Sequence, residues 1–70
     1  MVTGKSNLVE VMGIFRHETE WAWLVDFGLP KPVWFPKRLV EIDFGDRSKV
    51  TVTMPDWLAV EKGIENLVRE

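Results

Sequence analysis

The sequence predicts a small α+β protein that is mainly β: a four-strand antiparallel meander, curled into a half-barrel, with one C-terminal helix. Short runs of β-branched and aromatic residues alternate with polar ones, and turn residues separate these runs. An apolar stripe at helical spacing occurs only near the end of the chain. Because no helical segment lies between the strands, no crossover can join parallel neighbours, and the sheet must be antiparallel.

The first half of the chain contains two of the predicted strands. Leu8–Phe15 is rich in apolar and β-branched residues, and Gly13 within it indicates a bulge. Glu20–Phe27 is the second strand, and turn residues follow it. Both of its faces carry apolar side chains, although the aromatic face is the simpler choice for the core. The two faces are Trp21, Trp23, Val25 and Phe27 on one side, and Glu20, Ala22, Leu24 and Asp26 on the other.

The segment Lys31–Arg38 holds two prolines, two adjacent aromatic residues and three cations. Proline fixes φ and lacks a backbone donor, so strands tolerate it only at an edge, a start or a bulge. A third strand therefore begins in this segment, is interrupted at Pro36, and continues or bends over Leu39–Phe44. Because successive side chains alternate, we expect one of the rings of Trp34 and Phe35 to enter the core while the other stays at its rim.

The last strand and the helix have the clearest patterns. Gly45–Ser48 has the composition of a hairpin turn, and Lys49–Met54 alternates cleanly between apolar and polar residues. Pro55–Lys62 is predicted as a helix, because proline suits a first helical turn. This helix either ends at Gly63 or continues to about Val68, at a cost of ~1 kcal/mol for the glycine. The stripe expected to face the core is Trp57, Val60, Ile64 and Leu67.

Length and charge restrict the class of protein. Seventy residues allow one small domain, predicted to span residues 1–70 with residues 1–6 frayed. There is no cysteine, which excludes disulfides and fits a cytoplasmic location. The net charge of −2 is shared equally by the two halves (3 cations against 4 anions, then 6 against 7), so bulk charge favours neither nucleic acid nor a membrane. We expect no signal peptide and no membrane span, because no apolar run is long enough.

No group of residues predicts catalysis. His17 is the only histidine, and an enzyme would need it in one pocket with a carboxylate such as Glu18 or Asp43. The glycines are isolated, so none of them opens a phosphate-binding loop. We therefore predict that the protein is not an enzyme, and we assign no catalytic residue, no cofactor and no metal site.

Several segments together carry a family resemblance. They include Val33-Trp-Phe-Pro-Lys37, Val52-Thr-Met-Pro-Asp-Trp-Leu-Ala59 and Glu61-Lys-Gly63. Over roughly residues 18–64 the chain resembles a group of small uncharacterised proteins common in bacteriophages and prophages. Members of that group share Trp-x-Pro-Lys-Ser and a C-terminal Pro-Glu-Trp-Leu-Ala…Lys-Gly helix. Arg38 stands where the group has serine, so no role of that hydroxyl carries over, and the resemblance implies no particular activity.

The resemblance also bears on the second strand. In the group, position 21 is often polar, whereas Ala22 and Leu24 recur. This implies that Ala22 and Leu24 face the core, and that Trp21 and Trp23 lean outward. The alternation by itself favours the reverse, so the buried face of strand 20–27 stays open between two choices.

The two characteristic segments of the group recur together, which suggests that they pack on each other. We therefore expect Trp34 to lie near Trp57 or Leu58, within the ~4.5 Å of an apolar contact. Lys37 and Arg38 have a simple structural role in this arrangement, since charged side chains keep an edge strand soluble.

The functional prediction is a non-enzymatic, phage-type accessory module that binds another protein, such as a host factor. Exposed tryptophans would give it the contiguous apolar patch that marks an interface. The alternative is a small β-barrel that binds single-stranded nucleic acid by stacking bases on an exposed ring beside cations. A homodimer would also cover an exposed aromatic face. The candidate partner-binding residues are Trp21, Trp23, Trp34, Lys31, Lys37 and Arg38.

Overall fold

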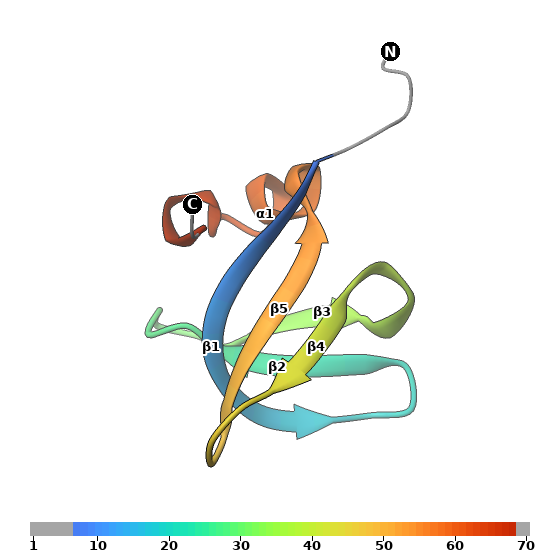
Figure 1. The fold of residues 1–70 in the computed structure, drawn as a ribbon, viewed down its shortest axis with the longest axis vertical. Helices are drawn as coiled ribbons and strands as arrows, with labels where there is room; N and C mark the ends of the chain where they lie inside the picture. Colours follow the sequence, from blue (N-terminus) through green and yellow to red (C-terminus); the bar gives the residue numbers. More distant parts are fainter. Residues whose placement is uncertain (1–6, 69–70) are drawn as a thin grey trace.

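The computed structural model describes residues 7–68 as five strands, one α-helix and two 3-10 turns (Figure 1). The predicted fraying of residues 1–6 lies outside the described residues. Within residues 7–68, no helix is long and apolar enough to cross a membrane. The elements are β1 (Leu8–Glu18), β2 (Ala22–Asp26), β3 (Val33–Pro36), η1 (Lys37–Leu39), β4 (Glu41–Phe44), β5 (Lys49–Pro55), α1 (Asp56–Glu61) and η2 (Glu65–Leu67).

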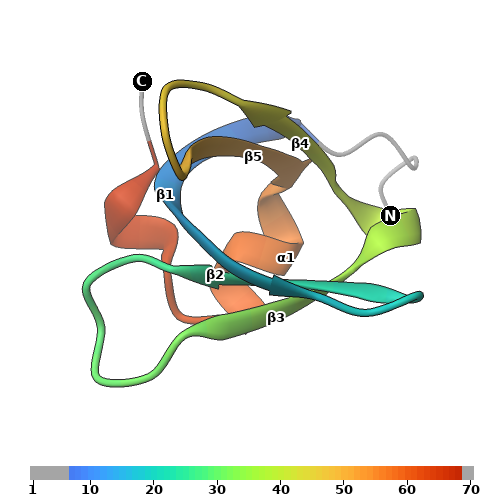
Figure 2. The same cartoon turned by 90° about the horizontal axis from the view of Figure 1, so that it is seen from below.

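The strands form one antiparallel sheet in the order β3-β2-β1-β5-β4. The predicted class, mainly β with a helix after the last strand, is confirmed. The four-strand meander is wrong, because there are five strands and the last one pairs with the first. The half-barrel is corrected to an open sheet, since β3 and β4 are its two unpaired edges in the described part of the chain. The sheet curves strongly (Figure 2), and α1 lies at one end of it (Figure 1).

Pro36 splits the predicted third strand into two. β3 ends at this proline, and β4 begins at Glu41 on the opposite edge of the sheet. The Lys37 N–H donates to the Trp21 carbonyl oxygen at 2.8 Å. By the two-residue period of a strand, the Phe35 nitrogen then faces β2 and the Pro36 nitrogen faces away from the sheet. A residue without an N–H thus occupies the free edge, where no ladder bond is lost.

β1 is longer than predicted because it serves two neighbours. Its first part pairs with β5 and its last part with β2, so the sheet bends along this strand. The predicted bulge at Gly13 is wrong, since the register shifts between Phe15 and His17. Gly13 instead allows β2 to approach, because a Cβ at this position would lie 2.7 Å from side-chain atoms of both Phe27 and Val25.

The buried face of β2 is the aromatic one. Val25 is fully buried, and Trp23 and Phe27 pack against the core. Leu24, on the opposite face, is half-buried. The orientation implied by the family resemblance is therefore wrong for the strand itself. Trp21, which precedes β2, is nevertheless 75% exposed.

The core lies on the concave face of the sheet. The alternation of β5 is confirmed, because Val50, Val52 and Met54 are all buried. The expectation for the adjacent rings of β3 is also confirmed, since Phe35 is fully buried and Trp34 is 43% exposed. The buried residues are Val11, Val25, Phe35, Val40, Val50, Val52, Met54, Leu58, Ala59 and Ile64.

The helix ends at the shorter of its two predicted lengths. Gly63 adopts a φ of 75°, which glycine reaches without steric cost, and the chain leaves the helix there. The longer helix is therefore wrong. The predicted core-facing stripe is confirmed at Ile64, which is fully buried, and is wrong at Trp57, Val60 and Leu67, which are exposed. Leu58 and Ala59 are buried in their place. With fewer than two turns, α1 enters the core through one adjacent pair instead of a long stripe.

The expected packing of Trp34 on the helix segment is wrong in its choice of ring. Trp34 is not among the residues that form or flank the core cluster of residues 7–68. Phe35 and Leu58 share that cluster instead.

The close approach at Gly13 generates a stability prediction. Gly13→Ala places a methyl group against side chains in a packed core, so we expect a loss of about 1–3 kcal/mol in the free energy of unfolding, measured by urea titration. Gly45→Ala is the matched control, because a Cβ there would meet only the Lys49 carbonyl oxygen, at 3.5 Å. If both variants unfold at the same urea concentration as the wild type, the close approach is not tight.

Candidate functional site

A hydrogen-bonded loop between β1 and β2 carries the most exposed tryptophan of the described chain. The Thr19 hydroxyl oxygen accepts hydrogen bonds from the N–H groups of Trp21 at 3.2 Å and Ala22 at 3.0 Å. The Thr19 N–H donates back to the Ala22 carbonyl oxygen at 2.9 Å. Threonine and serine favour such turns because a hydroxyl can replace a backbone acceptor. The Trp21 backbone is thus held while its ring, 75% exposed, stays in solvent.

Lys37 ties this loop to the end of β3. Its N–H bonds the Trp21 carbonyl oxygen, so both backbone polar groups of Trp21 are satisfied. Its ammonium nitrogen lies 2.5 Å from a carboxylate oxygen of Glu18 and 4.5 Å from the ring centre of Trp23. The ion pair is partly exposed, so it contributes ~1 kcal/mol or less, and its main effect is to fix the lysine side chain in place.

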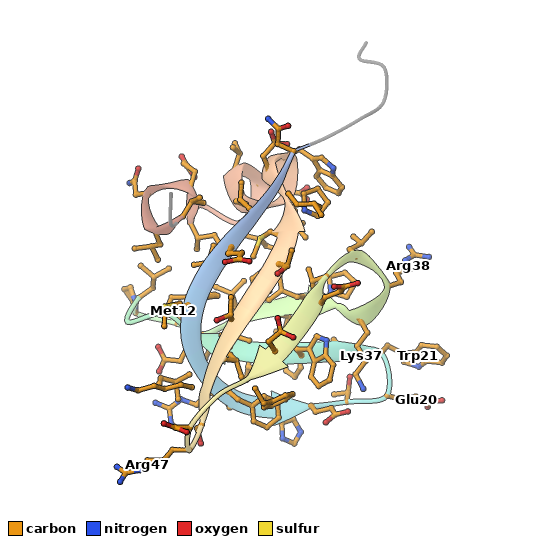
Figure 3. All side chains as sticks on the ribbon, viewed as in Figure 1. Met12, Glu20, Trp21, Lys37, Arg38 and Arg47 are labelled. Atoms are coloured by element: carbon orange, nitrogen blue, oxygen red, sulfur yellow. The ribbon has the colours of Figure 1, made fainter. Side chains whose placement is uncertain are left out.

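A groove of about 610 Å³ lies beside the projecting ring of Trp21. Pro36 contributes an apolar wall, and Lys37 and Arg38 follow it directly in the chain. In the view of Figure 3, Arg38 and Glu20 lie on opposite sides of Trp21, which points away from the protein. The residues that line the groove are Glu20, Trp21, Pro36, Lys37 and Arg38. These five residues form the Trp21 surface.

Trp23 supports this surface from beneath. Its ring makes edge contacts with Phe15 at 6.3 Å and with Phe44 at 6.0 Å between centroids. Phe15 and Phe44 also contact each other, at 5.4 Å. Such edge-to-face contacts stabilise by about 0.5–1.5 kcal/mol each beyond the buried area. The ring of Trp23 therefore packs within the protein, under the Lys37 ammonium group.

The other two candidate residues lie elsewhere. Trp34 is on the convex face of the sheet, with its ring 6.2 Å from that of His17 in an edge contact. Lys31 is exposed in the loop before β3, whereas Lys37 and Arg38 follow that strand. Figure 1 shows the β2–β3 loop and η1 at opposite ends of β3. The structure therefore brings Trp21, Lys37 and Arg38 together and separates them from Lys31 and Trp34.

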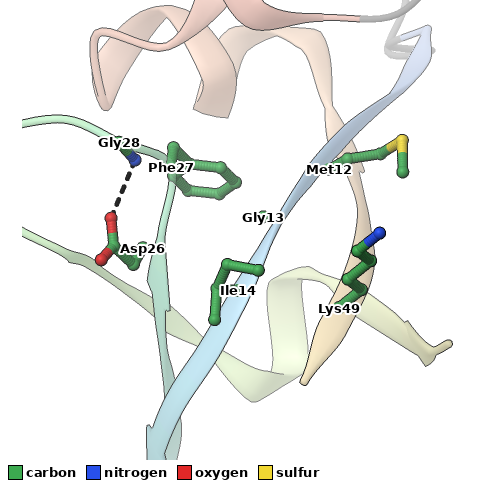
Figure 4. A pocket seen from close by; sticks show the side chains of 7 residues that line it. All are labelled: Met12, Gly13, Ile14, Asp26, Phe27, Gly28 and Lys49. Atoms are coloured by element: carbon green, nitrogen blue, oxygen red, sulfur yellow. Dashed lines mark hydrogen bonds between the residues drawn. The ribbon is translucent and has the colours of Figure 1, made fainter. Parts of the chain in front are cut away.

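A second hollow, of about 420 Å³, opens where β1 and β2 diverge (Figure 4). Its lining is mostly apolar and includes Met12, Ile14 and Phe27, with Asp26 and Lys49 as its charged residues. The Gly28 N–H donates to Asp26 Oδ1 at 2.8 Å, and Arg16 binds Asp26 Oδ2 at 2.9 Å. The hydrogen bond from Gly28 and then the one from Arg16 hold the pKa of Asp26 below its ordinary value. This carboxylate is thus already engaged within the protein.

Sequence reasoning missed two residues of the Trp21 surface, Glu20 and Pro36. The alternation of residues 20–27 places Glu20 in a strand, and a proline within a strand pattern indicates only a break at Pro36. One usable signal existed, because a threonine between two polar residues favours a turn that starts at that position. Such a turn would have moved Glu20 and Trp21 from the second strand into the loop.

Within residues 7–68, no group of three histidine, aspartate or glutamate side chains is placed to hold a metal ion. His17 lies beside Trp34, while Glu18 binds Lys37. Comparison of the chain with protein-family models, with curated protein sequences and with solved structures finds no match. The assignment of a function thus depends on the chain itself.

The two hydrogen bonds on Asp26 generate a prediction about pH. Because its pKa in the folded protein lies below the reference value of 3.8, its ionised form stabilises the fold above that pH. This stabilisation is lost as the pH falls through 3.8 and then through the lower native pKa. Asp26→Asn should therefore lower the thermal midpoint at neutral pH and have a progressively smaller effect in acid. If the thermal midpoint of Asp26→Asn stays below that of the wild type by the same amount from neutral to strongly acidic pH, the ionised carboxylate is not the cause.

Proposed function

We propose that the protein is a non-enzymatic interaction module that binds another protein through the Trp21 surface. The observation that carries the proposal is the 75% exposure of Trp21 on a loop whose backbone is held by hydrogen bonds. Tryptophan and arginine are the residues most enriched among energetic hot spots of protein interfaces. Arg38 lies in the same groove, so both residue types are present together.

The hydrogen bonds around Trp21 matter for affinity as well as for shape. Binding through a mobile loop costs conformational entropy, and that cost is reduced when the loop is already ordered in the free protein. A tryptophan side chain has only two rotatable bonds, so it offers a large contact area at little further cost. The adjacent Pro36 is rigid too, and it gives the groove a fixed apolar wall.

The resemblance to the bacteriophage group supports the view of this module as a phage-type accessory protein. A host protein is then the natural class of partner. The cysteine-free sequence fits a reducing compartment, so the proposal places the interaction in the cytoplasm.

Nucleic-acid binding is the less supported alternative. Trp34 is partly exposed beside His17, as a stacking platform would need. However, the cations expected beside it lie elsewhere, and Lys37 is already paired with Glu18. The proposal therefore predicts that single-stranded oligonucleotides leave tryptophan fluorescence unchanged at low salt. Quenching that weakens steeply with added salt would support the alternative instead.

The proposal predicts that the protein captures a defined partner from a host extract, and that Trp21→Ala weakens this capture at least about tenfold, as loss of a hot spot should. Quantitative mass spectrometry of the captured proteins measures the change. Trp57→Ala is the matched control, because Trp57 is 46% exposed but lies on α1, outside the Trp21 surface. Equal recovery of every captured protein by the wild type and both variants counts against the proposal.

A further inference from the structure

An anion and a cation that are unpaired within the described chain lie on opposite sides of the Trp21 ring in the view of Figure 3. Three charged residues line the groove beside Trp21, and one of them, Lys37, is paired with Glu18. Glu20 and Arg38 are both exposed, and within residues 7–68 neither side chain makes a hydrogen bond or an ion pair. The Trp21 surface therefore reads, from one side to the other, as anion, aromatic ring, cation.

We propose that this surface pairs with a second copy of the same chain. The inference rests on the proposed function, because it takes the Trp21 surface as the binding surface and says what covers that surface before another protein displaces it. A two-fold interface brings the same patch of both copies together, so the patch must be complementary to itself. An anion and a cation on opposite sides of a central apolar group satisfy this condition.

The pairing geometry follows from the symmetry. A two-fold axis lies in the plane of the interface, passes beside Trp21, and runs perpendicular to the line from Arg38 to Glu20. Rotation about it places Arg38 of each copy against Glu20 of the other, so two ion pairs form. The two Trp21 rings meet near the axis, beside the apolar wall of Pro36. The rings then supply most of the contact, while the ion pairs fix the orientation of the two copies.

Other occupants fit the surface less well. A strongly acidic peptide or a nucleic-acid strand would gain Arg38 but would meet the like charge of Glu20. A basic segment would gain Glu20 but would meet the like charge of Arg38. A different protein fits only if it presents the same order of charges around an apolar group. A second copy has this order because its surface is identical. Such a protein would have to displace the second copy in order to bind.

Paired charge reversal tests the inference. Wild-type protein should show concentration-dependent dimerisation in sedimentation velocity over about a hundredfold range of concentration. Glu20→Arg alone and Arg38→Glu alone should each weaken it at least about tenfold, because like charges then face each other twice. An equimolar mixture of the two variants should dimerise again, since each arginine meets a glutamate of the other variant. Both positions are exposed, and circular dichroism confirms that each variant is folded.

The controls make the same charge changes away from the Trp21 surface. Lys31→Glu and Glu61→Arg alter exposed residues on the β2–β3 loop and α1, and they should leave dimerisation unchanged. A wild type that stays monomeric throughout, or a mixture that is no more dimeric than its components, overturns the inference. If the wild type is monomeric yet Trp21→Ala still loses a captured protein, only the self-pairing fails. If the wild type dimerises and Trp21→Ala loses no captured protein, the binding of another protein fails instead.

Discussion

The hydrogen bond from the Lys37 N–H to the Trp21 carbonyl oxygen connects the fold to its candidate site. The nitrogen of Pro36, directly before it, faces the free edge of the sheet, whereas the Lys37 N–H faces the β1–β2 loop and bonds to it. The same bond closes the loop that presents Trp21. One short contact therefore ends β3, holds the β1–β2 loop, and brings Pro36 and Arg38 beside an exposed ring.

The features of the fold that local sequence controls could be predicted. The alternation in β5 identifies Val50, Val52 and Met54 as core residues. Gly63 offers one of two possible ends for the helix, and the structure has the shorter one. The order of the strands could not be predicted in this way. Pro36 signals a break wherever it occurs, but whether the next strand extends β3 or crosses to the other edge depends on its pairing with β5, which lies later in the chain.

The site shows the same division between local and long-range information. Strand alternation correctly separated the rings of Trp34 and Phe35, because that separation is a property of two adjacent residues. The cations of the Lys31–Arg38 segment are close in sequence, yet Lys31 precedes β3 and Lys37 follows it, so the strand separates them. The ion pair of Lys37 joins residues 19 positions apart, and no local pattern identifies Glu18 as its partner.

The two tryptophans near the start of β2 have different roles, because one packs within the protein and the other is exposed. Trp23 packs under Lys37 with Phe15 and Phe44 and supports the surface from within. Trp21, two positions earlier, precedes the strand and escapes burial. Moving the start of β2 by two residues, as the sequence had suggested, would place Trp21 in the sheet instead. The Thr19 turn is thus what turns a core-type residue into a candidate contact residue.

The central claim is that the chain holds an exposed tryptophan on an ordered backbone. NMR relaxation and solvent paramagnetic broadening, measured together on Trp21 in wild-type protein diluted until it is monomeric, test it most directly. We predict that the Trp21 backbone amide is as ordered as those of β1 and β2, while its indole signal is broadened by a soluble paramagnetic agent more than that of Trp23. A mobile Trp21 amide, or an indole as protected as that of Trp23, would contradict the account.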